Sequence, residues 1–234
     1  MNGSFHAFGF QHWMALAILG VLAFLIVWTT RQFPTGVRRR VGYGLGVVLL
    51  AYMIVSYIRG GCLGILSCKE SLPLHLCNWT MAVCIFTLFR PTPLGFELAY
   101  FWGMSGTLQA LITPDLPAGF PSWSFIQFFW SHGGTLLSIV FMIAGLGLRP
   151  RPGSVGRMFI AVNVYALTAG ICDALFGWNY GYLCHPPLRV SLMDYLGPWP
   201  WYILGLELIA LVSFILLDAP WRWHRAALKE RGSG

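Results

Sequence analysis

Charged residues are scarce in this sequence. Asp, Glu, Lys and Arg make up only 10% of the 234 residues, whereas a soluble domain usually carries about 25%. Hydrophobic residues account for 57%, and no polar stretch is long enough to form a separate soluble domain. The composition excludes an ordinary water-soluble globular protein and indicates a membrane protein with a single domain, residues 1–234.

Acidic residues are scarcer still, with 8 Asp and Glu against 15 Lys and Arg and a formal net charge of +7. A basic surplus can indicate nucleic-acid binding, but here the basic residues lie in short loops between apolar runs, as membrane topology requires. The cysteines form no CxxC pair and no zinc-type spacing, so we expect neither a metal nor a cofactor. Cys62 and Cys68 share one predicted loop, and whether they pair is left open.

Seven apolar runs approach the roughly 20 residues that a helix needs to cross a bilayer core. They cover residues 11–30, 41–59, 72–89, 94–113, 123–148, 157–177 and 199–217. The sequence therefore predicts an all-α, polytopic membrane protein with seven transmembrane helices. No basic segment precedes the first run, which favours an uncleaved span over a signal peptide.

The positions of lysine and arginine predict the orientation. Most follow the odd-numbered spans, namely Arg31, Arg38, Arg39, Arg40, Arg90, Arg149, Arg151, Arg157, Arg222, Arg225, Lys229 and Arg231. The opposite side has only Arg59, Lys69 and Arg189. By the positive-inside rule, the N-terminus lies outside and the C-terminus lies in the cytoplasm. We expect a multi-pass protein of a bacterial cytoplasmic membrane, with its active site toward the outer leaflet.

Ionisable side chains within a membrane are costly and indicate functional sites. The predicted spans contain His75, Glu97, His132, Asp173 and Glu207, with Asn78, Gln109 and Asn163 as uncharged polar residues. We expect Glu97 to be a boundary residue near Arg90, and Asn163 and Glu207 to form hydrogen bonds between helices. Gly42 and Gly46 make a GxxxG pattern, for which close helix packing is the favoured interpretation.

Cys77 and His132 are predicted at similar depths in the outer half of the membrane. They lie five and nine residues into their spans, or roughly 7–8 Å and 13–14 Å at about 1.5 Å per residue. A cysteine beside a histidine can lose its proton and attack a carbonyl, giving a thioester. Alone, each residue type more often serves packing or helix contacts. His75 is not expected to be the base, because residues two apart on a helix point about 200° apart.

Four segments resemble the YwaF-like integral membrane family, which is related to transmembrane protein 164. They are LPLHLC at 72–77, GTLQALITPDL at 106–116, FIQFFWSHGG at 125–134 and NYGYLCHPP…SLMDYLGPWPWYI at 179–203. The resemblance implies an acyltransferase that moves a fatty acyl chain between phospholipid and lysophospholipid. Its Cys/His pair falls on Cys77 as nucleophile and His132 as general base. More distant androgen-induced-gene hydrolases cleave lipid esters with a Thr/His pair.

The remaining polar residues receive supporting roles. The candidate oxyanion donors are Asn78, Gln109 and Trp79. Asn179, Tyr182 and Asp194 lie in the long outer loop at 178–198, where ordering the loop is favoured over binding a lipid headgroup. For His75, a hydrogen bond to a neighbouring helix is favoured over a substrate role.

Alternative functions stay open at this point. A lipid ester hydrolase would use the same dyad with water as the acceptor. A transporter would need polar residues that continue to the cytoplasmic side, where the spans look mainly apolar except for Glu207. A non-catalytic lipid-binding scaffold would keep the pocket without a nucleophile touching a base, and a seven-span receptor ranks last because the loops are short.

Overall fold

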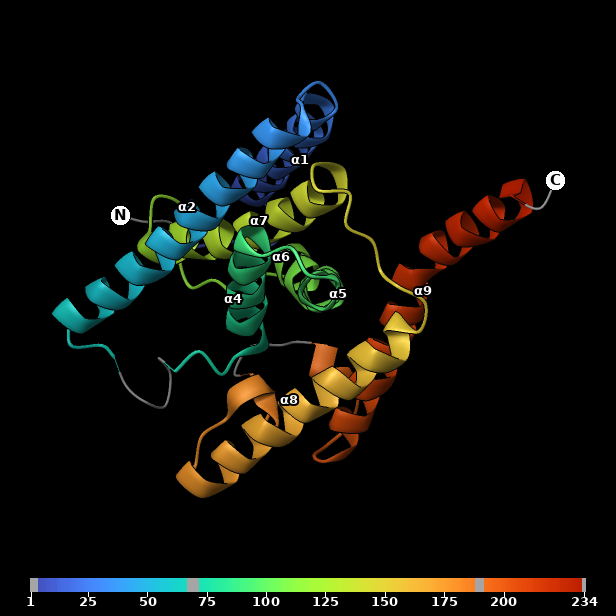
Figure 1. The fold of residues 1–234 in the computed structure, drawn as a ribbon. Coiled ribbons are helices and arrows are strands. Elements are labelled where there is room, and N and C mark those ends of the chain that lie inside the picture. Colours follow the sequence, from blue (N-terminus) through green and yellow to red (C-terminus); the bar gives the residue numbers. More distant parts are fainter. Residues whose placement is uncertain (1–3, 67–71, 188–191, 233–234) are drawn as a thin grey trace. The chain divides into compact units, whose positions relative to one another are not determined.

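The computed structural model describes residues 4–66, 72–187 and 192–232, and in these residues all regular secondary structure is helical (Figure 1). The all-α prediction is confirmed. The main helices are α1 (Phe10–Thr30), α2 (Thr35–Cys62), α4 (Leu76–Phe89), α5 (Pro93–Trp102), α6 (Leu108–Ile112), α7 (Trp123–Ala144), α8 (Ser154–Phe176) and α9 (Trp201–Gly232). A π-helix, η1 (Gly103–Thr107), joins α5 to α6, and two short 3₁₀ helices, η2 (Tyr180–Tyr182) and η3 (Leu192–Tyr195), precede α9.

Within the described residues, five helices are long and apolar enough to cross a membrane: α1, α2, α7, α8 and α9. Several spans in one chain indicate a multi-pass membrane protein. The other two predicted spans correspond to α4 and to the continuous α5–η1–α6 segment. With 14 residues, α4 is about 21 Å long, less than a bilayer core of roughly 30 Å. The seven-span count and the orientation stay predictions.

Several predicted boundaries were wrong. The third span was expected to begin at Leu72, but α4 begins at Leu76, because Pro73 disfavours the helical conformation in the residue before it. His75 therefore precedes the helix, and Cys77 is its second residue. Helix α2 begins directly after Pro34, so Arg38 lies in the helix rather than in a loop. Helix α9 continues to Gly232 and includes most of the basic tail.

Capping residues position the helices around the site. The hydroxyl of Thr92 accepts a hydrogen bond of 3.1 Å from the backbone N–H of Gly95, and Pro93 follows as the first residue of α5. The hydroxyl of Ser122 accepts one of 3.2 Å from the N–H of Phe125 and so begins α7. Both capping hydrogen bonds join residues three positions apart in the sequence, and they determine where α5 and α7 begin.

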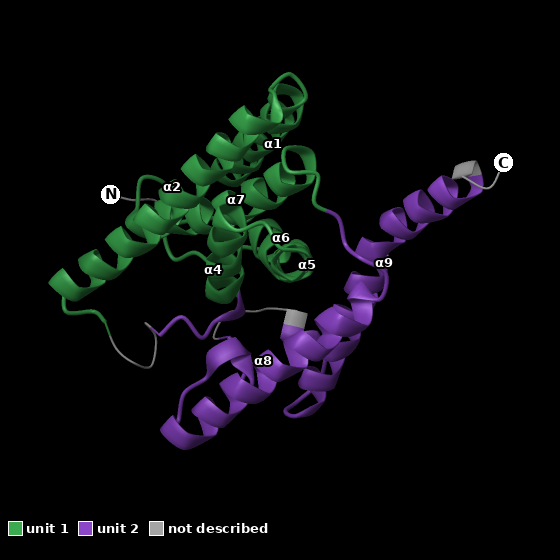
Figure 2. Cartoon of the chain, viewed as in Figure 1, with its two compact units in different colours: residues 1–66, 77–148 green, residues 67–76, 149–234 purple. Residues whose placement is uncertain are grey.

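The chain divides into two compact units (Figure 2). Helices α1, α2 and α4 to α7 belong to the first, apart from Leu76, the first residue of α4. Helices α8 and α9, with η2, η3 and the residues just before Cys77, belong to the second. The prediction of a single domain is not tested by this division.

Polar residues of the second unit pair within it. The side-chain amide of Asn163 on α8 donates a hydrogen bond of 2.9 Å to Glu207 on α9, which confirms the predicted contact between helices. In the middle of α9, the buried carboxylate of Asp218 accepts hydrogen bonds from Arg222 at 2.6 Å and Arg225 at 3.2 Å. These contacts pair the polar groups of an otherwise apolar pair of helices.

Glycines bring helices together in the first unit. A Cβ atom built on Gly46 of α2 would lie 3.2 Å from the Phe89 ring and 3.4 Å from Leu88, both on α4. One on Gly42 would lie 3.0 Å from Phe141 of α7. The GxxxG pattern is therefore a packing surface, as predicted.

Gly44 provides a matched control for this packing, because a Cβ atom there meets nothing within 4 Å. We expect Gly46→Leu to lower the free energy of unfolding by about 1–3 kcal/mol relative to Gly44→Leu, since only the former overpacks the α2–α4 contact. Thermal unfolding of both variants in detergent micelles measures this. Equal transition midpoints would contradict the packing role of Gly46.

Candidate active site

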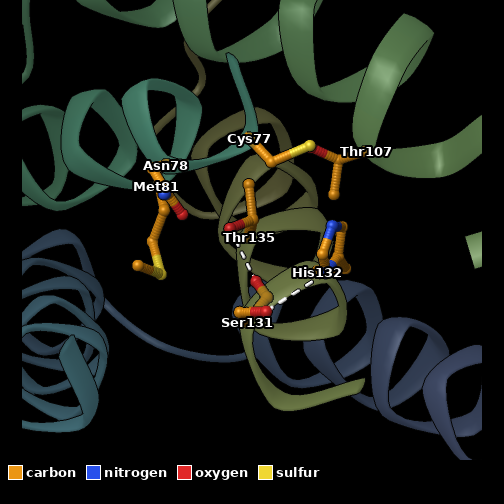
Figure 3. Close-up of a pocket in the computed structure, with 7 residues that line it drawn as sticks. All are labelled: Cys77, Asn78, Met81, Thr107, Ser131, His132 and Thr135. Atoms are coloured by element: carbon orange, nitrogen blue, oxygen red, sulfur yellow. Dashed lines mark hydrogen bonds between the residues drawn. The ribbon is translucent and has the colours of Figure 1, made fainter. Parts of the chain in front are cut away.

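One small pocket in the first unit contains both predicted catalytic residues (Figure 3). Its lining residues come from α4, from the end of η1 and from α7: Cys77, Asn78, Met81, Thr107, Ser131, His132 and Thr135. The cavity measures about 20 Å³, which is room for about one water molecule. The structure thus brings together Cys77 and His132, which are 55 positions apart in the sequence (132 − 77).

Hydrogen bonds fix the orientation and tautomer of His132. Its Nδ1 atom lies 3.0 Å from the carbonyl oxygen of Phe128 and 3.1 Å from the hydroxyl of Ser131. Since a carbonyl can only accept, Nδ1 carries the proton, and in the neutral ring Nε2 carries the lone pair. The Phe128 ring stacks on the imidazole with centroids 4.2 Å apart. His132 is therefore held with Nε2 as its basic atom.

Cys77 lies in the first turn of α4 and is partly buried. Within the described residues, no hydrogen bond joins its Sγ atom to His132, although both side chains line the pocket. Catalytic hydrogen bonds commonly tighten only in the substrate complex. The arrangement is that of a cysteine and a base within one cavity.

The predicted oxyanion donors are not all at the pocket. Asn78 lines it. Gln109 is exposed on α6, where its amide donates a 3.2 Å hydrogen bond to Thr113, and Trp79 is 43% exposed. Of these three residues, only Asn78 is placed to reach a reacting group beside Cys77.

Asn179 makes several hydrogen bonds within the loop that follows α8. Its Oδ1 atom accepts hydrogen bonds from the backbone N–H groups of Cys184 and His185 at 3.0 and 3.1 Å, and its amide donates to the carbonyl of His185 at 2.9 Å. The carbonyl of Tyr182 accepts a 2.6 Å hydrogen bond from Tyr202 of α9. These contacts support the favoured interpretation that the two residues order the loop.

His75, Asp173 and Asp194 also belong to the second unit. His75 packs against Tyr180 with ring centroids 4.8 Å apart, and Asp194 is exposed in η3. Asp173 is buried, and one of its carboxylate oxygens accepts a 2.8 Å hydrogen bond from the N–H of Tyr180. Glu97, expected at a helix boundary, is fully buried in α5 of the first unit. Cys68 lies outside the described residues, so its pairing with Cys62 is not tested.

Sequence reasoning missed four pocket residues: Met81, Thr107, Ser131 and Thr135. Ser131 is adjacent to His132, and Thr135 comes three positions after it, one helical turn along α7. Helical periodicity alone could have found both. Thr107 comes from a π-helix, for which the sequence carries no clear signal.

Comparison with known proteins identifies the family of the chain. The sequence profile of the TMEM164 family matches residues 7–218. The chain belongs to the TMEM164 family. A Treponema pallidum (strain Nichols) protein, described as an uncharacterized protein, is 26% identical over 221 residues, which is 92% of this chain and 89% of that one. No solved structure matches the chain significantly. The expected relation to transmembrane protein 164 is confirmed.

If His132 takes the proton of Cys77 in this TMEM164-family chain, the rate at which the Cys77 thiol reacts should depend on His132. We expect His132→Gln to slow iodoacetamide alkylation of Cys77 by about tenfold, because the thiolate is the reactive form. Site-resolved mass spectrometry over a time course measures the rate at each cysteine.

Two other cysteines are internal controls. Cys84 is fully buried and should stay unmodified. Burial and the neighbouring carboxylate of Asp173 raise the pKa of Cys184, so its alkylation should be slow at neutral pH and faster at higher pH. The alkylation rate of Cys184 should be the same in wild type and His132→Gln. Equal Cys77 rates in wild type and His132→Gln, with Cys184 unchanged, would contradict the pairing.

Proposed function

We propose that this protein is an intramembrane phospholipid acyltransferase, with Cys77 as nucleophile and His132 as general base. One observation carries the proposal: side chains from α4 and α7 converge on one pocket, with the basic Nε2 atom of His132 set by the Phe128 carbonyl. The family resemblance adds the substrate class. In apolar surroundings, the available carbonyl esters are those of lipid acyl chains.

In the first half-reaction, Nε2 of His132 takes the thiol proton as the sulfur attacks the acyl carbonyl carbon. The ester C–O bond then breaks, and the imidazolium returns the proton to the leaving oxygen. The products are a lysophospholipid and a thioester on Cys77. Protons and electron pairs balance without a cofactor.

In the second half-reaction, a lysophospholipid hydroxyl gives its proton to Nε2 and attacks the thioester carbonyl. The C–S bond breaks, and the sulfur regains a proton from His132. The acyl chain has moved between two glycerol oxygens. In both half-reactions His132 accepts the proton of the attacking group and returns a proton to the leaving group, so one histidine is sufficient.

A lipid ester hydrolase is the second candidate, and the size of the cavity favours it. The space of about 20 Å³ admits one water molecule. A water that reached the thioester would release a free fatty acid through the same steps. The two activities differ only in the acceptor, so the ratio of fatty acid to new phospholipid separates them.

The acyl-enzyme is the first species to seek. We expect wild-type protein incubated with mixed phospholipids to gain the mass of one fatty acyl chain, removable by hydroxylamine as a thioester is. Cys77→Ala should gain nothing, and His132→Gln should acylate at least about 100-fold more slowly. Intact-protein mass spectrometry with peptide mapping measures each.

Cys84→Ala is the matched control, because Cys84 lies on the same helix but is fully buried and does not line the pocket. It should acylate as wild type does. Lipid exchange activity that persists in Cys77→Ala would overturn the cysteine mechanism.

A further inference from the structure

Thr107 has a buried hydroxyl that makes no hydrogen bond. Its side chain is 1% exposed, and its Oγ1 atom has no partner among the described residues. The neighbouring hydroxyls of Thr135 and Ser105 donate to a carbonyl one turn back, to Ser131 at 2.8 Å and to Phe101 at 2.6 Å. A buried polar group without a partner is costly, so Thr107 needs a different explanation.

The π-helix η1 places Thr107 at the pocket. In η1 the N–H of Leu108 bonds the carbonyl of Gly103, five residues back, so the segment holds one residue more than an α-helical turn. Each extra residue rotates the next part of the helix by about 100° around the helix axis. Insertions of this kind are frequent at functional sites.

The hydroxyl and the candidate nucleophile line the same pocket. Figure 3 shows the side chains of Cys77, Thr107 and His132 directed toward this pocket. We propose that the Thr107 hydroxyl donates a hydrogen bond to the oxyanion that forms when Cys77 attacks the acyl carbonyl. This inference rests on the proposed function and adds a catalytic residue to it. A donor already free of other partners needs no rearrangement when the charge develops.

Acylation rates of Thr107 variants distinguish oxyanion binding from a contribution of Thr107 to folding. We expect Thr107→Val, which keeps the shape and removes the hydroxyl, to slow Cys77 acylation by roughly 100-fold, the loss typical of one oxyanion donor. Thr107→Ser should recover most of the rate. Thr87→Val is the matched control, because Thr87 also has a buried, unpartnered hydroxyl but lies outside the pocket. It should acylate at the wild-type rate.

Alkylation of Cys77 by iodoacetamide distinguishes the oxyanion from the thiolate, because alkylation develops no negative charge on oxygen. The proposal requires slow acylation with unchanged alkylation in Thr107→Val. Wild-type acylation in this variant, or a parallel loss of both rates, overturns it while Cys77 remains the nucleophile. A wild-type protein that forms no thioester overturns the proposed function as well.

A second site lies among α1, α2 and α7 of the first unit, where α1 and α2 each pack against α7 (Figure 1). Its cavity measures about 80 Å³, four times the volume at Cys77 (80/20). Its lining is mostly apolar, with Arg38 as the one charged residue: Ile26, Thr29, Thr30, Phe33, Arg38, Val41, Leu45 and Phe141. The hydroxyls of the two threonines donate to carbonyls of α1. A mostly apolar cavity with one cation in its lining is suited to an amphiphile with an anionic head.

Arg38 differs from the arginines around it. Arg31, Arg39 and Arg40 are exposed, as orientation signals should be. The Arg38 side chain is partly buried, its Nη1 makes a long 3.4 Å hydrogen bond to the carbonyl of Gly145, and its buried Nε has no partner among the described residues. A guanidinium with an unused N–H can bind a phosphate.

From the cavity and this unused donor we infer that the site binds an anionic phospholipid, with the phosphate at Arg38 and part of an acyl chain in the cavity. Native mass spectrometry with phosphatidylglycerol, and with phosphatidylcholine of the same chains, tests this. Wild type should retain phosphatidylglycerol preferentially. Arg38→Gln should lose that preference by about tenfold, whereas Arg40→Gln, the same charge change at an exposed position, should keep it.

Equal retention of phosphatidylglycerol in Arg38→Gln and wild type would overturn the site. Palmitate as a further probe identifies the head chemistry. If palmitate binding depends on Arg38 and phosphatidylglycerol binding does not, the ligand is a free carboxylate and the phospholipid assignment is wrong. Cys77→Ala should bind phosphatidylglycerol like wild type, because the two cavities share no lining residue.

Discussion

The first unit depends on how closely its helices approach α7. A Cβ atom on Gly133 would collide with Leu19 of α1, and one on Gly134 would crowd Leu49 of α2. On the opposite side, Gly103 of η1 leaves room for Ile139. These contacts lie within about two helical turns of His132 and bring α1, α2 and η1 close to α7. Small residues are the usual means of such close packing in lipid, where burial of apolar surface gives no driving force between helices.

Polar groups in this unit obey a second constraint. In apolar surroundings each needs a partner, and on α7 the helix itself supplies it. Ser131, Thr135 and Ser138 all donate to carbonyls three or four residues back, and His132 uses the same device to set its tautomer. Thr107 and Arg38 differ from these residues, because each has a buried donor without a partner among the described residues and each also lines a cavity. In the proposed roles, a ligand supplies the missing acceptor.

The sequence was sufficient to predict the all-helical class, because apolar runs separated by Pro, Gly and Arg leave few alternatives. Depth in the predicted spans and the family resemblance together also pointed to Cys77 and His132, and both side chains line one pocket. The sequence prediction failed where geometry departs from a regular helix. Gln109 seemed to reach the site because its span was taken as uninterrupted, but η1 changes the register just before it. The start of α4 was misplaced because hydropathy does not register the proline turn at 72–75.

The partner of His132 bears on the choice of nucleophile. In serine hydrolases a carboxylate holds the histidine and stabilises the imidazolium charge. Here a backbone carbonyl and a serine hydroxyl hold it, which fixes the ring without adding negative charge. A thiol, with an unperturbed pKa of about 8.5, gives up its proton far more readily than an alcohol and so needs less help. A histidine held by a backbone carbonyl therefore suits the proposed cysteine nucleophile better than it would suit a serine.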